Sequence, residues 1–237
     1  MKSAPKAFIF DVFGTIVDWR TSVARVVEKA FANKEVTIDA LAFADYWRGQ
    51  YVPAMAVIRS GSRGYVALDQ LHFENLTATL NHFELETVLS PSERWVLNTA
   101  WEQLDPWPDV VSGLTALKAQ SIIAPCSNGS IALMTRLAKY GGLPWDCILG
   151  ADIAQNYKPE LQVYHACCEA LRLNPEEVMM VAAHNDDLEA AQQAGLKTGF
   201  IARPTEYGEH QCKDFEATGN WDSIVETIGE LATLFEG

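Results

Sequence analysis

A short apolar run that ends at an acidic residue is the feature that most constrains the fold of this 237-residue chain. Residues 7–10 are apolar and β-favouring, and Asp11 follows directly. Such a run predicts a buried strand of a parallel sheet, and ligands of open α/β sheets bind beyond the carboxyl ends of the strands. Gly14 permits a tight turn there, and Thr15 offers a hydroxyl to the carboxylate. Asp11 is therefore a candidate nucleophile, and the alternative is that it only caps the strand.

The elements predicted after this strand indicate the fold class. Apolar runs predict strands at 121–127, 147–149, 178–183 and 198–202, and helical patterns lie at 108–119, 130–139, 160–171 and 187–194. This alternation is typical of an α/β fold with a Rossmann-like, doubly wound parallel sheet.

The stretch between the first strand and Trp107 differs in its predicted secondary structure. It shows only helical patterns, at 21–33, 38–59, 65–82 and 91–103, and Pro53 is expected to kink the second of these helices. We therefore expect an α/β core domain from residues 1–17 and 101–237, with an all-helical cap domain, residues 18–100, inserted after the first strand.

Composition excludes several classes of function. The formal net charge of −13 disfavours nucleic acid and anionic membranes as partners. The five cysteines are odd in number and form no CxxC pair, which argues against a disulfide framework and a zinc site. No apolar run suits a signal peptide or a membrane span, so we expect a soluble protein of the cytoplasm.

Two further groups of polar residues lie in the predicted core, at residues 127–128 and at residue 158. Ser127 and Asn128 end a strand and lead into a helix, where hydroxyls and free backbone N–H groups can hold an anion. An ordinary helix cap is the alternative for this pair. Lys158 precedes Pro159 in a loop. A buried lysine there could pair with Asp11 and keep it ionised, whereas a surface lysine would have no such role.

The last cluster follows the strand at 178–183. Asp187 can cap the next helix and face Lys158, and His184 is either a structural histidine or a group that transfers a proton. Tyr164 lies about one helical turn after Pro159 and is expected to pack in the core, with its hydroxyl reaching the pocket.

The joint order of these motifs resembles that of the haloacid dehalogenase superfamily over nearly the whole chain. In that family the four motifs meet at the carboxyl edge of one sheet, and a helical cap closes over them. The phosphatases of the family carry a second Asp where this chain has Phe13, and an early acid that helps to hold magnesium where it has Ala183. The chain is more similar to the (S)-2-haloacid dehalogenases, whose Trp-Arg pair resembles Trp47 and Arg48.

The resemblance implies a mechanism and a role for each candidate. Asp11 would attack the carbon that bears the halogen, and water would hydrolyse the resulting ester, with no metal or other cofactor. The resemblance implies that Thr15, Ser127 and Lys158 position Asp11 and that Arg48 stabilises the departing halide. It also implies that the substrate carboxylate is bound by Ser127, Asn128 and the N–H groups of Val12 and Phe13. The partners implied are a small 2-haloacid, water and a second copy of the chain in a homodimer.

The fourth motif departs from the resemblance. Dehalogenases of this kind have Ser, Asn and Asp where the chain has Ala182, His184 and Asp187, and an aromatic residue where it has Asp186. We therefore hypothesise that His184 acts with Asp187 on the hydrolytic water. Two other functions stay open: a magnesium-dependent phosphatase or phosphonate hydrolase, for which Asp186 could supply the missing acid, and a non-catalytic binder with the same fold.

Overall fold

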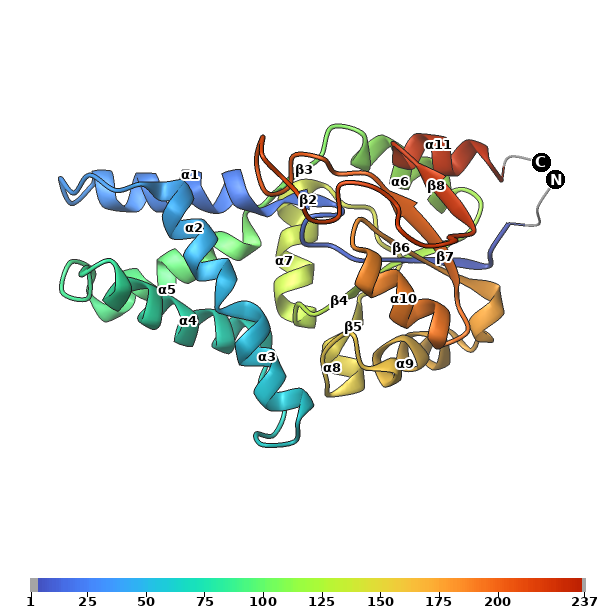
Figure 1. Cartoon of the computed structure of the whole chain (residues 1–237), viewed down its shortest axis with the longest axis horizontal. Coiled ribbons are helices and arrows are strands. Elements are labelled where there is room, and N and C mark those ends of the chain that lie inside the picture. The colour runs from blue at the N-terminus through green and yellow to red at the C-terminus, as the bar shows by residue number, and fades with distance from the viewer. Residues whose placement is uncertain (1–3, 236–237) are drawn as a thin grey trace.

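The computed structural model describes residues 4–235 and contains a six-stranded parallel sheet in the order β5-β4-β1-β6-β7-β8 (Figure 1). Its strands are β1 (Ala7–Phe10), β4 (Ile122–Ser127), β5 (Leu149–Gly150), β6 (Val178–Ala182), β7 (Lys197–Ile201) and β8 (Ser223–Val225). The central strand β1 places Phe10 beside Pro125 of β4 and Val181 of β6. Asp11 therefore lies where the ends of three neighbouring strands meet, and the predicted α/β fold is confirmed.

Helices cover both faces of the sheet because β1 is apolar on both of its sides. Phe8 and Phe10 belong to one hydrophobic cluster, and Ala7 and Ile9 belong to the other. The elements of this core outside the sheet are α6 (Val110–Lys118), α7 (Ile131–Gly141), α8 (Ala151–Ala154), α9 (Leu161–Leu171), η2 (Pro175–Glu177), α10 (Asn185–Gln193) and α11 (Ile228–Thr233). Buried side chains of α6, α7 and α11 join the first cluster, and those of α9 and α10 join the second.

The inserted segment is helical throughout and lies to the left of the sheet in Figure 1. It contains α1 (Trp19–Ala32), α2 (Ala40–Gly49), α3 (Tyr51–Arg59), α4 (Leu68–His82), α5 (Pro91–Asn98) and the 3-10 turn η1 (Thr99–Glu102). The strands β2 (Val17–Asp18) and β3 (Asp105–Pro106) pair antiparallel at its two ends. The expected domain boundaries, at 17/18 and 100/101, fall within β2 and within η1.

One predicted helix is wrong, because residues 38–59 form two helices that meet at Gln50. Pro53 lies in the first turn of α3, where a missing N–H costs no intrahelical hydrogen bond. It therefore belongs to a helix start and does not kink a longer helix. The sequence also gave no sign of β2, β3, β8 or α11, which are short elements.

Contacts between the helical insertion and the rest of the chain hold the two parts together. The Tyr65 hydroxyl donates to Asp152 at 2.6 Å, the Tyr157 hydroxyl donates to the carbonyl of Val66 at 2.5 Å, and Arg59 donates to the carbonyl of Lys158 at 3.2 Å. The insertion also shares the hydrophobic cluster of Phe8. The insertion is thereby fixed over the carboxyl edge of the sheet, beside Asp11. Within residues 4–235, no helix has the length and apolar character that a bilayer crossing requires.

Candidate active site

Asp11 lies immediately after β1 and its side chain is only 9% exposed. Its Oδ2 atom accepts a hydrogen bond of 2.8 Å from the Thr15 hydroxyl, which itself accepts one of 2.9 Å from the backbone N–H of Ala183. Its Oδ1 atom lies 2.8 Å from Nζ of Lys158. Each carboxylate oxygen therefore faces donors that fix its position.

Lys158 connects Asp11 to a second buried acid. Its Nζ atom also donates to Oδ2 of Asp187 at 2.5 Å, and the Tyr164 hydroxyl donates to Oδ1 of Asp187 at 2.5 Å. The backbone N–H of Lys158 donates to the side-chain oxygen of Asn128 at 2.8 Å. The four motifs that the sequence singled out therefore meet at one edge of the sheet.

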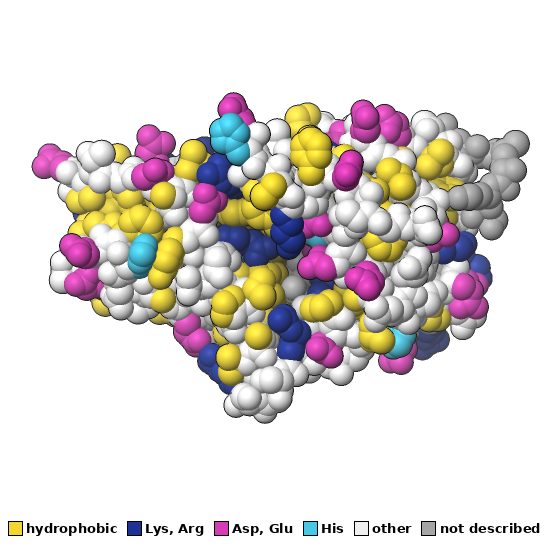
Figure 2. All heavy atoms as spheres, in the orientation of Figure 1, with side chains coloured by type: hydrophobic (Ala, Val, Ile, Leu, Met, Phe, Trp, Pro, Cys, Tyr) yellow, Lys and Arg dark blue, Asp and Glu magenta, His cyan; other side chains and the backbone are white. Residues whose placement is uncertain are grey.

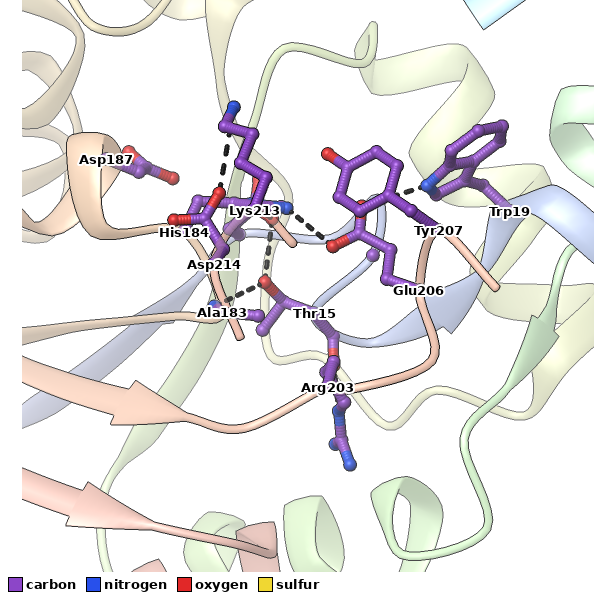
Figure 3. A network of polar contacts seen from close by, with 12 residues as sticks. Thr15, Trp19, Ala183, His184, Asp187, Arg203, Glu206, Tyr207, Lys213 and Asp214 are labelled. Carbon is purple, nitrogen blue, oxygen red and sulfur yellow. Dashed lines mark hydrogen bonds and ion pairs between the residues drawn. The ribbon is translucent and has the colours of Figure 1, made fainter. Parts of the chain in front are cut away.

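His184 lies between Asp11 and a carboxylate that the sequence analysis did not identify. Its Nδ1 atom is 3.2 Å from Oδ2 of Asp11, and its Nε2 atom is 2.9 Å from Oε2 of Glu206. The other oxygen of Glu206 accepts a hydrogen bond of 2.9 Å from the indole N–H of Trp19 (Figure 3). Glu206 is 1% exposed and comes from the loop that follows β7.

Burial and nearby charges shift the pKa values of Asp11 and Asp187, the two acids that contact Lys158, in opposite directions. Burial by itself would raise the pKa of Asp11, but Lys158 and His184 outweigh it and hold that pKa well below its ordinary value. Burial and the charge of Asp11 raise the pKa of Asp187. Burial would likewise lower the pKa of Lys158, and the charges of Asp11 and Asp187 raise it overall. Asp11 is therefore an anion beside an ammonium ion, which suits a nucleophile.

The pKa of His184 is shifted by a similar balance of burial and charge. Burial opposes its charge, but Glu206 and Asp11 together raise its pKa well above the ordinary value. A protonated imidazole donates through both ring nitrogens, and each nitrogen here faces a carboxylate oxygen.

Arg48 of α2 supplies a further positive charge from the helical insertion. The centre of its guanidinium group lies 3.8 Å from the ring centre of Tyr51 and 5.5 Å from that of Trp19. Its Nε atom is buried and has no hydrogen-bond partner within residues 4–235. A buried N–H without a partner is costly, so this guanidinium suits an anion held among aromatic rings.

A cavity of about 600 Å³ joins these groups. The residues that line it are Asp11, Phe13, Trp19, Asp45, Arg48, Gly49, Tyr51, Val52, Met55, Arg59, Asn128, Lys158, Pro159, His184, Asp186, Asp187, Tyr207 and Lys213. In the space-filling view, Lys and Arg side chains gather at the hollow between the insertion and the sheet (Figure 2). Four Lys and Arg side chains and four Asp side chains line the cavity, so it places cations next to Asp11 on a chain whose net charge is −13.

Comparison with known proteins agrees with this geometry. A family model described as haloacid dehalogenase-like hydrolase matches residues 5–195. The chain belongs to the haloacid dehalogenase-like hydrolases. The family resemblance inferred from the sequence is thereby confirmed.

Within this family, the chain is similar to several proteins that are named as 2-haloacid dehalogenases. The chain is 30% identical to (S)-2-haloacid dehalogenase 4A of Burkholderia cepacia, over 87% of this chain and 88% of that protein. It is 47% identical to the crystal structure of the defluorinating L-2-haloacid dehalogenase Rha0230, with a TM-score of 0.96 and coverage of 98% and 96%. The L-2-haloacid dehalogenase PA0810 is 43% identical, with a TM-score of 0.92 and coverage of 98% and 99%.

Most predicted site residues of this haloacid dehalogenase-like hydrolase lie around one cavity. Asp11, Phe13, Arg48, Asn128, Lys158, His184 and Asp187 line it, and Thr15 and Tyr164 contact lining residues from behind. Ser127 is completely buried, and its hydroxyl accepts the backbone N–H of Gly129 at 3.0 Å. Ser127 and Val12 are not among the residues that line the cavity.

One predicted pairing is wrong. His184 contacts Glu206 and Asp11, whereas Asp187 is held by Lys158 and Tyr164. His184 precedes α10 with an extended backbone, φ −108° and ψ 123°, so it does not share the helical face of Asp187 three residues later. The hypothesis that Asp187 is the partner of His184 is replaced by a contact with Glu206.

The residues that distinguish the magnesium-dependent alternative are apolar in this chain. Phe13 is 3% exposed and packs edge-on against Tyr51 and Trp101, and Ala183 is 1% exposed. Phe13 cannot donate a proton to the leaving group of a phosphoester, and Ala183 offers no hard oxygen ligand of the kind that Mg²⁺ requires. Within residues 4–235, no group of three or more His, Cys, Asp and Glu side chains is arranged to hold a metal ion.

Proposed function

We propose that this protein hydrolyses short (S)-2-haloalkanoic acids to 2-hydroxy acids through an ester on Asp11. The observation that carries the proposal is the buried Asp11 carboxylate, paired with Lys158, in one cavity with the Arg48 guanidinium, whose buried Nε atom has no hydrogen-bond partner among residues 4–235. The relatives described above carry dehalogenase names, which supports the same activity.

The first step is a displacement at carbon. An oxygen of Asp11 forms a bond to the carbon that bears the halogen, and the carbon–halogen bond breaks with its electron pair on the departing halide. Halide leaves without a proton, so Phe13 can stand where a proton donor would be needed for a phosphoester. Arg48 stabilises the developing negative charge in a cavity lined by aromatic rings, where such interactions are stronger than in water.

The substrate carboxylate occupies the side of the cavity near Asn128. The Asn128 oxygen accepts the backbone N–H of Lys158, which leaves its amide nitrogen as a donor. The backbone N–H of Phe13 completes this site in the proposal, whereas Ser127 and Val12 lie outside the cavity lining, and Ser127 holds the turn after Asn128 by accepting from the N–H of Gly129. Tyr164 supports it indirectly, since its hydroxyl holds Asp187 against Lys158.

Three further features belong to the proposal. We propose that no metal is needed, and the apolar Phe13 and Ala183 and the ammonium ion of Lys158 between the two acids support this. A cytoplasmic location agrees with the free cysteines of the chain. A homodimer is proposed on the family resemblance, and light scattering on the purified protein tests it.

A single-turnover reaction in heavy-oxygen water tests the ester. With enzyme in excess over 2-chloropropionate, the new hydroxyl oxygen of the product comes from Asp11, so heavy oxygen appears in the Asp11 peptide and not in the product. Incorporation into the product alone would instead indicate direct attack by water and would refute the ester.

Two assays distinguish the dehalogenase from the magnesium-dependent hydrolase. One measures chloride release in excess EDTA, and the other measures phosphate release from an aryl phosphate with magnesium. Halide release that persists in EDTA supports the proposal. Phosphate release without any halide release would support the magnesium-dependent hydrolase. Asp11→Asn is expected to lower halide release by about four orders of magnitude or more, since it removes the nucleophile. Bound haloacid without turnover in the native protein would favour a non-catalytic binder.

A further inference from the structure

Glu206 is a buried acid whose two oxygens have separate partners. Oε1 accepts from the indole N–H of Trp19 and Oε2 contacts Nε2 of His184, both at 2.9 Å (Figure 3). The carboxylate lies directly against Gly14, since a Cβ atom on that glycine would be 2.1 Å from Oε1. The carboxylate therefore fills a space that a glycine keeps open next to the loop of Asp11.

The contact with Glu206 determines which ring nitrogen of His184 faces the nucleophile. With Nε2 held by Glu206, Nδ1 is directed to Asp11 at 3.2 Å. A carboxylate on one ring nitrogen keeps that nitrogen protonated and leaves the other as the site of proton exchange. The side chain of His184 is 12% exposed and borders the cavity, so water can reach it.

We propose that Glu206 is a positioning residue for hydrolysis of the ester, because it holds His184 with Nδ1 aimed at the Asp11 carboxyl, where the ring takes a proton from the attacking water. This inference rests on the proposed dehalogenase function and concerns its second half. Asp187 is not available for that role, because Lys158 and Tyr164 occupy its oxygens.

Formation of the ester changes the charge that His184 faces. Before the reaction, Asp11 and Glu206 both stabilise the protonated ring. Alkylation neutralises Asp11, so the ring keeps one anionic partner in place of two, its pKa falls, and the proton on Nδ1 passes to solvent through the cavity. The base is thus released only after the nucleophile has reacted.

The hydrolytic step then balances. The water oxygen bonds to the side-chain carboxyl carbon of Asp11, and one water proton moves to Nδ1 of His184. The bond from that carbon to the substrate oxygen breaks, and the same proton passes from Nδ1 to the departing oxygen, which gives the 2-hydroxy acid. The second water proton is left on Asp11 and moves to His184, which restores the initial ion pair. Over the whole cycle, one proton and one halide ion leave the enzyme.

The test compares the two half-reactions in Glu206→Gln by rapid quench with chloroacetate. The substitution keeps the shape and an accepting oxygen, but it removes the charge that makes the ring basic. We expect the burst of halide to stay within a factor of about two, and hydrolysis to slow by about 10²–10³-fold, as loss of assistance to general base catalysis does. The ester should accumulate on Asp11 and be seen as an intact-mass adduct. Glu209→Gln, an exposed acid in the same loop, is the matched control.

A pH profile distinguishes positioning from a structural role. Without the Glu206 charge, the pKa of His184 in the ester is lower, so the acid limb of the hydrolysis rate should move to lower pH. The other ionisable groups that border the cavity near it, among them Lys158, Asp186, Asp187 and Lys213, are unchanged in this variant. If Glu206→Gln does not fold, Glu206→Asp keeps the charge but withdraws it from Nε2, and the same accumulation of ester is expected.

Two results would overturn the inference: a hydrolysis rate and acid limb equal to those of the native protein, or an equal loss of both half-reactions. Failure of the proposed function looks different, because the native protein itself would then release no halide.

Discussion

The ammonium nitrogen of Lys158 lies 2.8 Å from Oδ1 of Asp11, and both side chains are less than a tenth exposed. The ion pair has little water around it, so the charge of Lys158 acts on Asp11 with little screening. Its effect is to keep the nucleophile ionised and to compensate Asp187 at the same time.

Lys158→Met should therefore impair the first half-reaction. Two buried carboxylates would face each other without a cation, and the pKa of Asp11 would rise toward its ordinary value. We expect the halide burst to slow by about 10²-fold or more and its acid limb to move to higher pH. Stopped-flow measurement of halide release across pH checks this, with Lys139→Met, at an exposed position of α7, as control. An unshifted acid limb would show that Lys158 does not control the ionisation of Asp11.

Arg48→Lys should discriminate between halogens. The substitution keeps the charge but loses the planar group that lies over Tyr51. A poorer leaving group needs more stabilisation in the transition state, so release of fluoride should fall more than release of chloride, and that more than release of bromide. We expect a loss of about 10²-fold or more for fluoroacetate. Ion chromatography with the three haloacetates measures the order. Equal losses for all three would indicate that Arg48 binds the substrate carboxylate.

The order of strands and the polar residues at their ends could be predicted because they depend on local pattern. The apolar run before Asp11, and the runs before Ser127 and His184, each end at the same edge of a parallel sheet. Once the strands are assigned, the topology alone brings these residues together. The pairing of Lys158 with Asp11 and Asp187 followed from the same reasoning and is seen in the structure.

Glu206 could not be predicted in this way because residues 202–222 have no periodic pattern. The path of that loop depends on tertiary contacts, such as the bidentate pair of Arg203 with Asp109 and the hydrogen bond from Arg203 to the carbonyl of Thr15. One signal was present: Glu206 follows the end of β7 at the edge where the other strands present polar residues. The wrong partner was proposed for His184 because Asp187 is an acid close to it in sequence, whereas Glu206 approaches it from a different loop.

The ion pairs of His184 predict a pH-dependent contribution to stability. Its pKa in the folded protein is raised above the ordinary value, about 6.5. Its stabilising effect is therefore complete below about pH 6.5 and is lost as pH rises through the raised value. The difference in melting temperature between the native protein and His184→Asn should be largest below pH 6.5 and should shrink in alkali. Calorimetry across pH measures it, beside the exposed His210→Asn. A difference that grows with pH would contradict a protonated His184.

Gly14→Ala should both destabilise the protein and slow hydrolysis of the ester. Gly14 has φ +91°, and an added Cβ would meet the Glu206 carboxylate at 2.1 Å, so Glu206 must leave Trp19 and His184. Gly61 also has a positive φ, +75°, but open space around its Cβ position, so Gly61→Ala measures the backbone strain alone. We expect Gly61→Ala to cost about 1 kcal/mol in urea unfolding and Gly14→Ala about 2–4 kcal/mol. Gly14→Ala should also accumulate the ester on Asp11, as Glu206→Gln does, whereas Gly61→Ala should not. Equal losses of unfolding free energy for the two variants would mean that the loop accommodates the added methyl group without moving Glu206. Glycine would then be needed at position 14 only for its positive φ.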